Sequence, residues 1–318
     1  MIETIFIEGL IYGITVLGLF ISYRTLNFCD MTIDGAFPMG GCVMALCLMN
    51  GVPSWVALII AFLAGCLAGL CTTLIYTRLR VPDLLAGILM MTMLYSVNLR
   101  IMKNRANVSF LKFDTIFSHF TDFGKAHFAF LSSEFGILVF LIIFILVLKG
   151  LLDVFFHTDL GLTMGALGAN QQMIISQGVN PKIVRGIGIC VGDGLASLSG
   201  AMAAMYNGFA DVGSGNGVIV SALASLMLGE FIIRSNKIAW QTFRVLIGSI
   251  VYRALMILAR RYGHYINLTA NDLKLVTGLL IIVCLIIANL KGKVNLSAHL
   301  KRPEKDAFSK KGKIGGAK

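Results

Sequence analysis

The chain has 318 residues, of which 57% are hydrophobic and only 14% are charged, and its formal net charge is +11. Soluble globular domains carry about 25% charged residues, so this composition excludes that class, and it equally excludes a disordered chain or a charged coiled coil. We therefore predict an integral membrane protein. Residues 291–318 hold nine Lys or Arg and two acids. The positive charge thus lies mainly in a basic tail that follows a membrane domain at 1–290.

Apolar runs long enough to cross a bilayer, roughly 17–25 residues each, recur along the chain. Pro53, Pro82 and Pro181 each stand in the first turn of a run, where the missing N–H is harmless. Pro38 lies inside the second run among glycines, so we expect that helix to be broken. The predicted fold class is an all-α polytopic membrane protein with about nine segments, one of them broken. These segments are 5–22, 31–50, 54–76, 83–101, 135–151, 182–206, 216–233, 239–258 and 272–290.

The distribution of basic residues predicts the orientation. Nine crossings place the two termini on opposite sides of the membrane. When the tail is cytoplasmic, that side receives 17 of the 27 Lys and Arg residues and the other side receives eight. This agrees with the positive-inside rule. The N-terminus lacks the basic region and cleavage site of a signal peptide, so we expect it to remain, on the outer face.

The segment at 102–134 is a long external loop in this orientation. It holds seven phenylalanines among polar residues. This pattern predicts a helix lying at the level of the lipid headgroups. It also suits a docking surface for an external partner, and the sequence leaves both interpretations open.

A polar segment at 152–181 lies on the cytoplasmic side. Residues 163–177 suit one short helix, and Gly178 stands where a C-cap glycine would. Asn180 and Pro181 then form the N-cap and first residue of the next span. The segment is either an ordinary connection or a lever that a cytoplasmic partner grips when ATP is hydrolysed on another chain.

The run at 182–206 has small residues spaced four apart, which allow helix backbones to approach closely in a membrane. We therefore place this helix at the centre of the bundle. The small residues are Gly188 and Gly192, followed by Ala196, Gly200 and Ala204.

A charge at the membrane centre costs at least about 2.5–3.5 kcal/mol, so acids within spans face the bundle interior or water. Asp30 and Asp34 begin the broken segment, where transporters bind solutes near the midplane, but an Asp there also suits a helix cap. Asp193 lies far from any helix end, which favours a polar or cavity-facing role, whereas Glu230 is expected at the interface. The candidate pathway residues are Asp30, Asp34, Tyr95, Asn98, Asp193 and Ser197.

Motifs of catalysis are missing from the sequence. It contains no H-E-x-x-H, no G-x-S-x-G and no Walker A motif, so we expect neither an enzyme nor a P-loop ATPase. Its seven cysteines form no C-x-x-C motif and no Cys/His cluster. We expect no metal site, and no nucleic acid as a partner.

Several stretches resemble a known family. Residues 26–41 (LNFCDMTIDGAFPMGG) resemble the second-helix signature of the permeases of branched-chain amino-acid ABC importers. The segment 160–181, which ends in QGVNP, is similar to the coupling segment of that family, and 197–230 to its following spans. The stretches 84–102 and 208–217 resemble more closely the bacterial permeases that pair with tryptophan- or tyrosine-type substrate-binding proteins. The resemblance covers about residues 5–290.

This resemblance implies a type II ABC importer permease in the bacterial plasma (inner) membrane, with the solute pathway between two copies of a homodimer. ATP and Mg would bind to separate cytoplasmic ATPase subunits, so this chain would need no cofactor, and an external substrate-binding protein would deliver the solute. Relatives often carry Arg where this chain has Gly168, which removes one expected polar contact with the ATPase. The implied coupling residues, within 160–180, are Gly165, Ala166, Gly168, Asn170, Gln171 and Gly178.

Two other functions compete with the importer. A stand-alone secondary transporter would work without an ATPase and is expected to show an inverted repeat, which the sequence does not display convincingly. A membrane-embedded enzyme would need a catalytic cluster. By resemblance an amino acid is the leading substrate, while nucleosides and sugars stay open.

Overall fold

The computed structural model describes residues 2–111, 113–127, 134–233 and 237–263, together with 278–279, 282–283 and 286. The chain divides into two compact units, Met1–Leu268 and Thr269–Lys318. The described residues of the second unit are helical. The predicted span at 272–290 lies mostly outside the described residues, and the basic tail at 291–318 lies wholly outside them.

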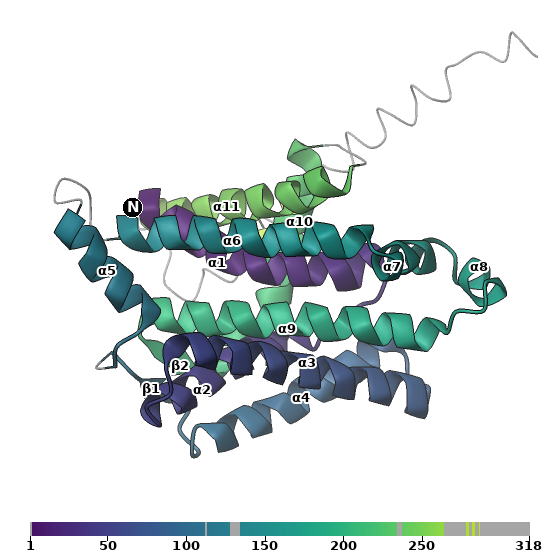
Figure 1. Cartoon of the computed structure of the whole chain (residues 1–318), viewed down its shortest axis with the longest axis horizontal. Coiled ribbons are helices and arrows are strands. Elements are labelled where there is room, and N and C mark those ends of the chain that lie inside the picture. Colours follow the sequence, from purple (N-terminus) through teal and green to yellow (C-terminus); the bar gives the residue numbers. More distant parts are fainter. Residues whose placement is uncertain are drawn as a thin grey trace, which may run out of the picture. The chain divides into compact units, whose positions relative to one another are not determined.

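The regular structure of the described part of the first unit is helical apart from one pair of short strands (Figure 1). Among the described residues, seven helices are long and apolar enough to cross a membrane, when the π-helix η1 is counted with α1 and the 3-10 helix η2 with α10. The shorter α2 is also apolar. The predicted all-α polytopic class is therefore confirmed. In chain order the elements are α1 (Ile2–Leu19), η1 (Phe20–Thr25), α2 (Ile33–Met49), α3 (Ser54–Leu79), α4 (Asp83–Ile101), β1 (Asn107–Ser109), α5 (Ile116–His127), α6 (Phe135–His157), α7 (Asp159–Ala169), α8 (Gln171–Ser176), α9 (Pro181–Asn207), β2 (Phe209–Asp211), η2 (Val212–Gly215), α10 (Val218–Ile232) and α11 (Ile238–Gly263).

Helix α9 is the centre of the unit, and it packs against α1, α2 and α3 (Figure 1). Its glycines touch the backbones of these neighbours. A Cβ added at Gly200 would lie 1.8 Å from the carbonyl oxygen of Phe37, and one added at Gly40 would lie 1.7 Å from that of Ser197. Because these distances leave no room for a methyl group, the small-residue spacing predicted the packing correctly.

Helix α2 corrects one expectation, because it runs without a break from Ile33 to Met49 with Pro38 inside it. The irregular stretch is 26–32, which precedes the helix. Pro38 donates no hydrogen bond to the carbonyl of Asp34, one turn earlier. Gly215 packs against that carbonyl, since a Cβ built on it would lie 1.9 Å from the oxygen. The surrounding helices thus hold the turn around the proline in place.

The polar segment after α6 is also different from the expectation, because it forms two helices rather than one. Asn170 has an extended backbone, which ends α7, and its side chain accepts hydrogen bonds from the N–H groups of Gln172 (3.0 Å) and Met173 (3.4 Å). Asparagine side chains cap helices well, so α8 starts anew at this point. As predicted, Asn180 caps α9 and Pro181 is its first residue.

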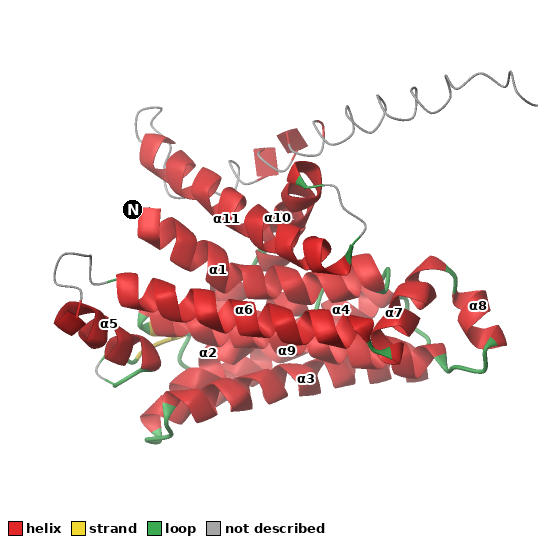
Figure 2. Ribbon diagram, turned by 45° about the horizontal axis from the view of Figure 1, so that its top comes forward, coloured by secondary structure: helices red, strands yellow, loops and turns green. Residues whose placement is uncertain are grey.

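Helices α7 and α8 lie at one end of the helices of this unit, and α5 lies at the other (Figure 2). Near α5, strand β1 pairs antiparallel with β2. The ring of Phe117 in α5 lies 6.0 Å from that of Phe140 in α6, and Phe110 is only 1% exposed. Phenylalanines of the predicted loop therefore pack inside the protein, while Phe113 stays 41% exposed.

Candidate translocation and coupling sites

Asp34 joins two helices that are far apart in the sequence. Its carboxylate accepts hydrogen bonds from the N–H of Gly217 (3.2 Å) and the N–H of Ile219 (2.7 Å), at the start of α10. The first N–H groups of a helix have no partner within it, and a negative charge there is stabilised by the helix dipole. The sequence offered a cap of its own helix as one alternative for Asp34, but the helix that its side chain caps is α10.

Asp30 is buried in the irregular stretch before α2, with 2% of its surface exposed. It accepts hydrogen bonds from the Thr32 N–H (3.0 Å) and the Ser22 hydroxyl (3.4 Å). The hydroxyls of Thr32 and Thr72 lie 2.8 Å apart. These contacts attach the stretch to η1 and α3, so Asp30 does not line an open path in this conformation.

Asp193 is wholly buried in α9, and neither oxygen of its carboxyl group has a hydrogen-bond partner among the described residues. The glycines on either side of it face α1 and α3. A Cβ on Gly192 would lie 2.7 Å from the Ser22 hydroxyl oxygen, and one on Gly194 would lie 2.7 Å from the Cys66 sulfur. The side chain that we expected to face a cavity thus lies in a closed helix interface.

The other three candidate pathway residues divide between the inside and the outside of the bundle. The Asn98 amide donates to the Gly35 carbonyl (3.2 Å), and the Ser197 hydroxyl donates to the Ala61 carbonyl (2.6 Å), both in buried positions. They join α4 to α2 and α9 to α3. Tyr95 is 52% exposed on the outer face of α4. Of the six candidates it is the most open to a solute in this conformation.

Sequence reasoning missed two further polar side chains on that face of α4. Thr92 and Ser96 are exposed together with Tyr95. The three lie within five residues of one helix, and we call them the α4 polar strip. A polar strip on an otherwise apolar helix marks a surface that lipid alone does not cover. The spacing of the three residues was visible in the sequence, but the direction in which α4 faces was not.

The predicted coupling residues occupy α7, α8 and the turn after them. Gly165 is exposed and has nothing within 4 Å of its built Cβ. Gly168 is different, because a Cβ there would lie 2.1 Å from the Thr25 carbonyl oxygen at the end of η1. An arginine at 168 would therefore displace η1. Ala166 is half-buried, and Gly178 has a φ of +80°, which closes the turn before α9.

Polar contacts hold α8 against the rest of the unit. Gln171, at the first position of α8, accepts a hydrogen bond from the Arg185 guanidinium (3.0 Å). Arg185 also donates to the hydroxyl of Tyr76 in α3. The coupling segment is thus tied to α3 and α9, the two helices that share the most extensive contact. Arg185 was not among the sequence-predicted residues, although its place in the first turns of α9 was visible.

Helices α7 and α8 expose apolar side chains to a degree unusual for a polar connection. Such exposed apolar groups mark a surface that contacts another protein or the membrane. They are Leu160 (45% exposed), Leu162 (56%), Met173 (51%) and Ile175 (51%). A cavity of about 330 Å³ opens beside them, lined by Phe20, Arg24, Phe156, Gly165, Gly168 and Gln241 among others.

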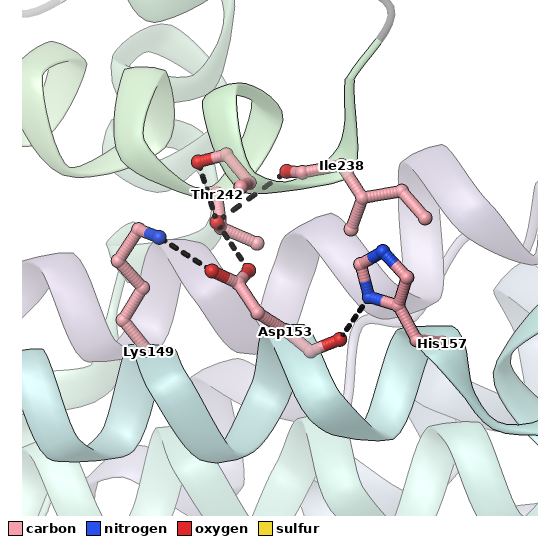
Figure 3. A network of polar contacts seen from close by, with 6 residues as sticks. Lys149, Asp153, His157, Ile238 and Thr242 are labelled. Carbon is pink, nitrogen blue, oxygen red and sulfur yellow. Dashed lines mark hydrogen bonds and ion pairs between the residues drawn. The ribbon is translucent and has the colours of Figure 1, made fainter.

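Charged groups connect the helices near this end. Glu230 of α10 pairs with Arg24 (3.1 Å) and with Arg244 (2.8 Å), whose side chain is only 7% exposed. A second network joins α6 to α11 (Figure 3): Asp153 pairs with Lys149 and accepts a hydrogen bond from the Thr242 hydroxyl at 2.7 Å. These contacts brace the helices on which the coupling segment rests.

Comparison with known proteins decides the family. The family described as the permease component of branched-chain amino acid transport systems matches residues 1–286. The chain belongs to this permease family. It is 35% identical over 289 residues to the tyrosine transport system permease protein of Clostridioides difficile (strain R20291), covering 91% of this chain and 92% of that protein. The permease is a multi-pass inner-membrane subunit of ABC transport, and the predicted resemblance is confirmed.

A second relative extends the same comparison. The permease is 33% identical over 278 residues to an uncharacterized protein of Rickettsia prowazekii (strain Madrid E), covering 87% of this chain and 94% of that protein. No solved structure matches the permease.

Proposed function

We propose that this permease forms the solute pathway of an ATP-driven importer for tyrosine or a related amino acid. The similarity to the tyrosine transport system permease over nearly the full length of both chains carries this proposal. ATP and Mg bind to separate ATPase subunits, and the permease contributes the helices that move. It performs no chemistry on the solute.

The cytoplasmic ATPase docks on α7 and α8. Three features support this assignment: the exposed apolar side chains of Leu162, Met173 and Ile175, the adjacent cavity, and the hydrogen bonds that tie α8 to α3 and α9. A force applied to α8 would reach the central helix through Arg185. In this assignment the side of the membrane that bears α7 and α8 is cytoplasmic.

The solute pathway lies between two copies of the permease. Within one copy, Asp30, Asn98 and Asp193 are buried and the helices around them are closely packed. The α4 polar strip instead faces outward, where a second copy would meet it. We therefore assign Tyr95, Thr92 and Ser96 to the pathway of a homodimer, and Asp34 to the support of the neighbouring start of α10.

An external binding protein delivers the solute to the opposite end. In the proposed orientation the N-terminus, α5 and the β1–β2 pair lie on the outer side (Figure 2). The cavity at this end has a volume of about 520 Å³ and is lined by Phe113, Glu134 and Tyr206 among others. It gives this face a concave, partly aromatic surface.

Copurification tests the ATPase contact directly. The ATPase expected to work with the permease would be coexpressed with the tagged chain, carrying either Met173→Asp or Ile175→Asp. Hot-spot contacts cost about 2 kcal/mol or more when lost, so the retained ATPase should fall more than tenfold. Leu111→Asp is the matched control, since this leucine is 77% exposed at the other end. Equal recovery with all three variants would refute the proposed contact.

A further inference from the structure

The wholly buried carboxyl group of Asp193 has no role in the proposed importer. It lies near the middle of α9, twelve residues after the helix begins at Pro181. Its neighbours Gly192 and Gly194 bring α9 close to Ser22 of η1, which continues α1, and to Cys66 of α3. The carboxyl group therefore lies where three helices meet, inside the membrane-spanning part of the chain.

No cation balances a charge at this place among the described residues. Both oxygens lack a hydrogen-bond partner, and none of the ion pairs of the described chain involves Asp193. The described residues also hold no group of three or more His, Cys, Asp or Glu side chains that could hold a metal ion. An isolated ionised carboxylate in an apolar interior costs far more than a neutral one. The geometry therefore favours the neutral acid.

A second buried acid strengthens this conclusion. Asp30 is 2% exposed, and the Ser22 hydroxyl that donates to it also lies against Gly192, the residue before Asp193. Asp30 accepts two hydrogen bonds, whereas Asp193 accepts none among the described residues. Ionised carboxylates that share one apolar interior repel one another, so the one without hydrogen bonds takes up the proton. The other titratable groups facing Asp193 are the thiols of Cys66 in α3 and Cys190, one turn earlier on α9.

We propose that Asp193 is a proton-binding site inside the membrane, protonated while α9 is packed against α1 and α3. When these helices separate, water reaches the carboxyl group and accepts its proton, and repacking of the helices returns a proton to it. The release step rests on the proposed function, because ATP-driven movement supplies the separation. The protonated state in the packed conformation does not depend on that function.

Infrared spectroscopy of the purified full chain in lipid bilayers tests the site. Isotope-labelled aspartate would shift the carbonyl band of protonated aspartic acid and so identify it in the wild-type protein. We expect this band near neutral pH, its loss in Asp193→Asn, and its retention in Asp30→Asn. A wild-type protein with no such band would overturn the proposal, and so would a band that disappears only in Asp30→Asn.

A salt titration distinguishes the proton from a bound cation. If Asp193 held sodium or potassium, the melting temperature of the wild type would rise with that ion relative to choline, and Asp193→Asn would lose the rise. We expect no such difference between the two proteins. A cation-specific rise would overturn the assignment. Because neither measurement uses the ATPase, failure here is distinguishable from failure of the importer proposal.

The release step has its own measurement. In the complete transporter trapped with a non-hydrolysable ATP analogue, the Asp193 band should weaken relative to the nucleotide-free complex. An unchanged band in a complex that has demonstrably changed conformation would overturn the release step.

Discussion

The carboxylate of Asp34, in the first turn of α2, accepts a hydrogen bond of 2.7 Å from the N–H of Ile219, in the first turn of α10. The two residues are 185 positions apart, so one side chain fixes the start of a helix from the other half of the chain. Pro38 lies one turn further along α2, and Gly215 packs against the Asp34 carbonyl that this proline leaves without an N–H partner. The start of α10 and the proline turn therefore support each other.

Loss of this cap should destabilise the permease. Replacing a capping side chain by Ala costs about 0.5–2 kcal/mol, so Asp34→Ala should lower the melting temperature of the purified protein. Asp34→Asn keeps one acceptor oxygen, so its melting temperature should lie between those of the wild type and Asp34→Ala. The control is Thr92→Ala, because the exposed Thr92 hydroxyl bonds only within its own helix, to the Leu89 carbonyl. A loss for Asp34→Ala no greater than that for Thr92→Ala would contradict the capping role.

The contact between α2 and α9 predicts a strong effect of a single methyl group. In Gly200→Ala the new Cβ would lie 1.8 Å from the Phe37 carbonyl oxygen, so the helices must move apart. Overpacking of this kind costs about 1–3 kcal/mol. Gly150→Ala in α6 is the matched control, since its Cβ meets nothing within 4 Å. Thermal unfolding in detergent should separate the two variants, and equal melting temperatures would show that the backbones are not in contact.

The coupling segment predicts a contrast between two of its glycines. Gly168→Arg should displace η1, because the Thr25 carbonyl already occupies the place of a side chain. We expect lower thermal stability and reduced retention of the ATPase. Gly165→Arg has open space and should leave the melting temperature unchanged. A Gly168→Arg variant that is as stable as wild type and binds the ATPase more tightly would contradict this. It would mean that an arginine at 168 can contact the ATPase, as in the relatives.

Glu230 should matter more for stability than its exposed partner Arg24. Glu230→Gln removes the negative charge beside Arg244, whose side chain is 7% exposed. A buried group that loses its partner costs about 1–3 kcal/mol, and more when it is charged. Arg24→Gln should cost less, since Arg24 is 57% exposed and exposed pairs contribute about 0–1 kcal/mol. Urea unfolding of the two variants measures this difference, and a larger loss for Arg24→Gln would contradict the role of Arg244.

Much of the fold could be predicted from the sequence, because a bilayer demands long apolar helices and the chain displays them. The cap at Asn180 and the close packing of Gly200 also follow from local patterns. The site could be predicted less well. Inside a membrane both the packed face and the lipid-facing side of a helix are mainly apolar, so the sequence does not reveal that Asn98 points inward and Tyr95 outward.

Two errors have identifiable physical causes. Pro38 was expected to break its helix, but a neighbouring segment from beyond residue 200 supports the turn, and no local pattern contains that information. Asn170 falls inside the one helix predicted from the sequence. Its side chain instead accepts hydrogen bonds from backbone N–H groups, which starts a new helix. The second signal was present in the sequence, since asparagine favours caps over helix interiors.

Tyrosine uptake into proteoliposomes tests the central claim most directly. The vesicles would contain the permease with its ATPase, the binding protein would be added outside, and ATP would be supplied on the ATPase side. We expect tyrosine uptake to require both ATP and the binding protein, and its rate to fall with Met173→Asp. Uptake by the permease alone, driven by an ion gradient after ATP is depleted, would contradict it and would identify a stand-alone secondary transporter.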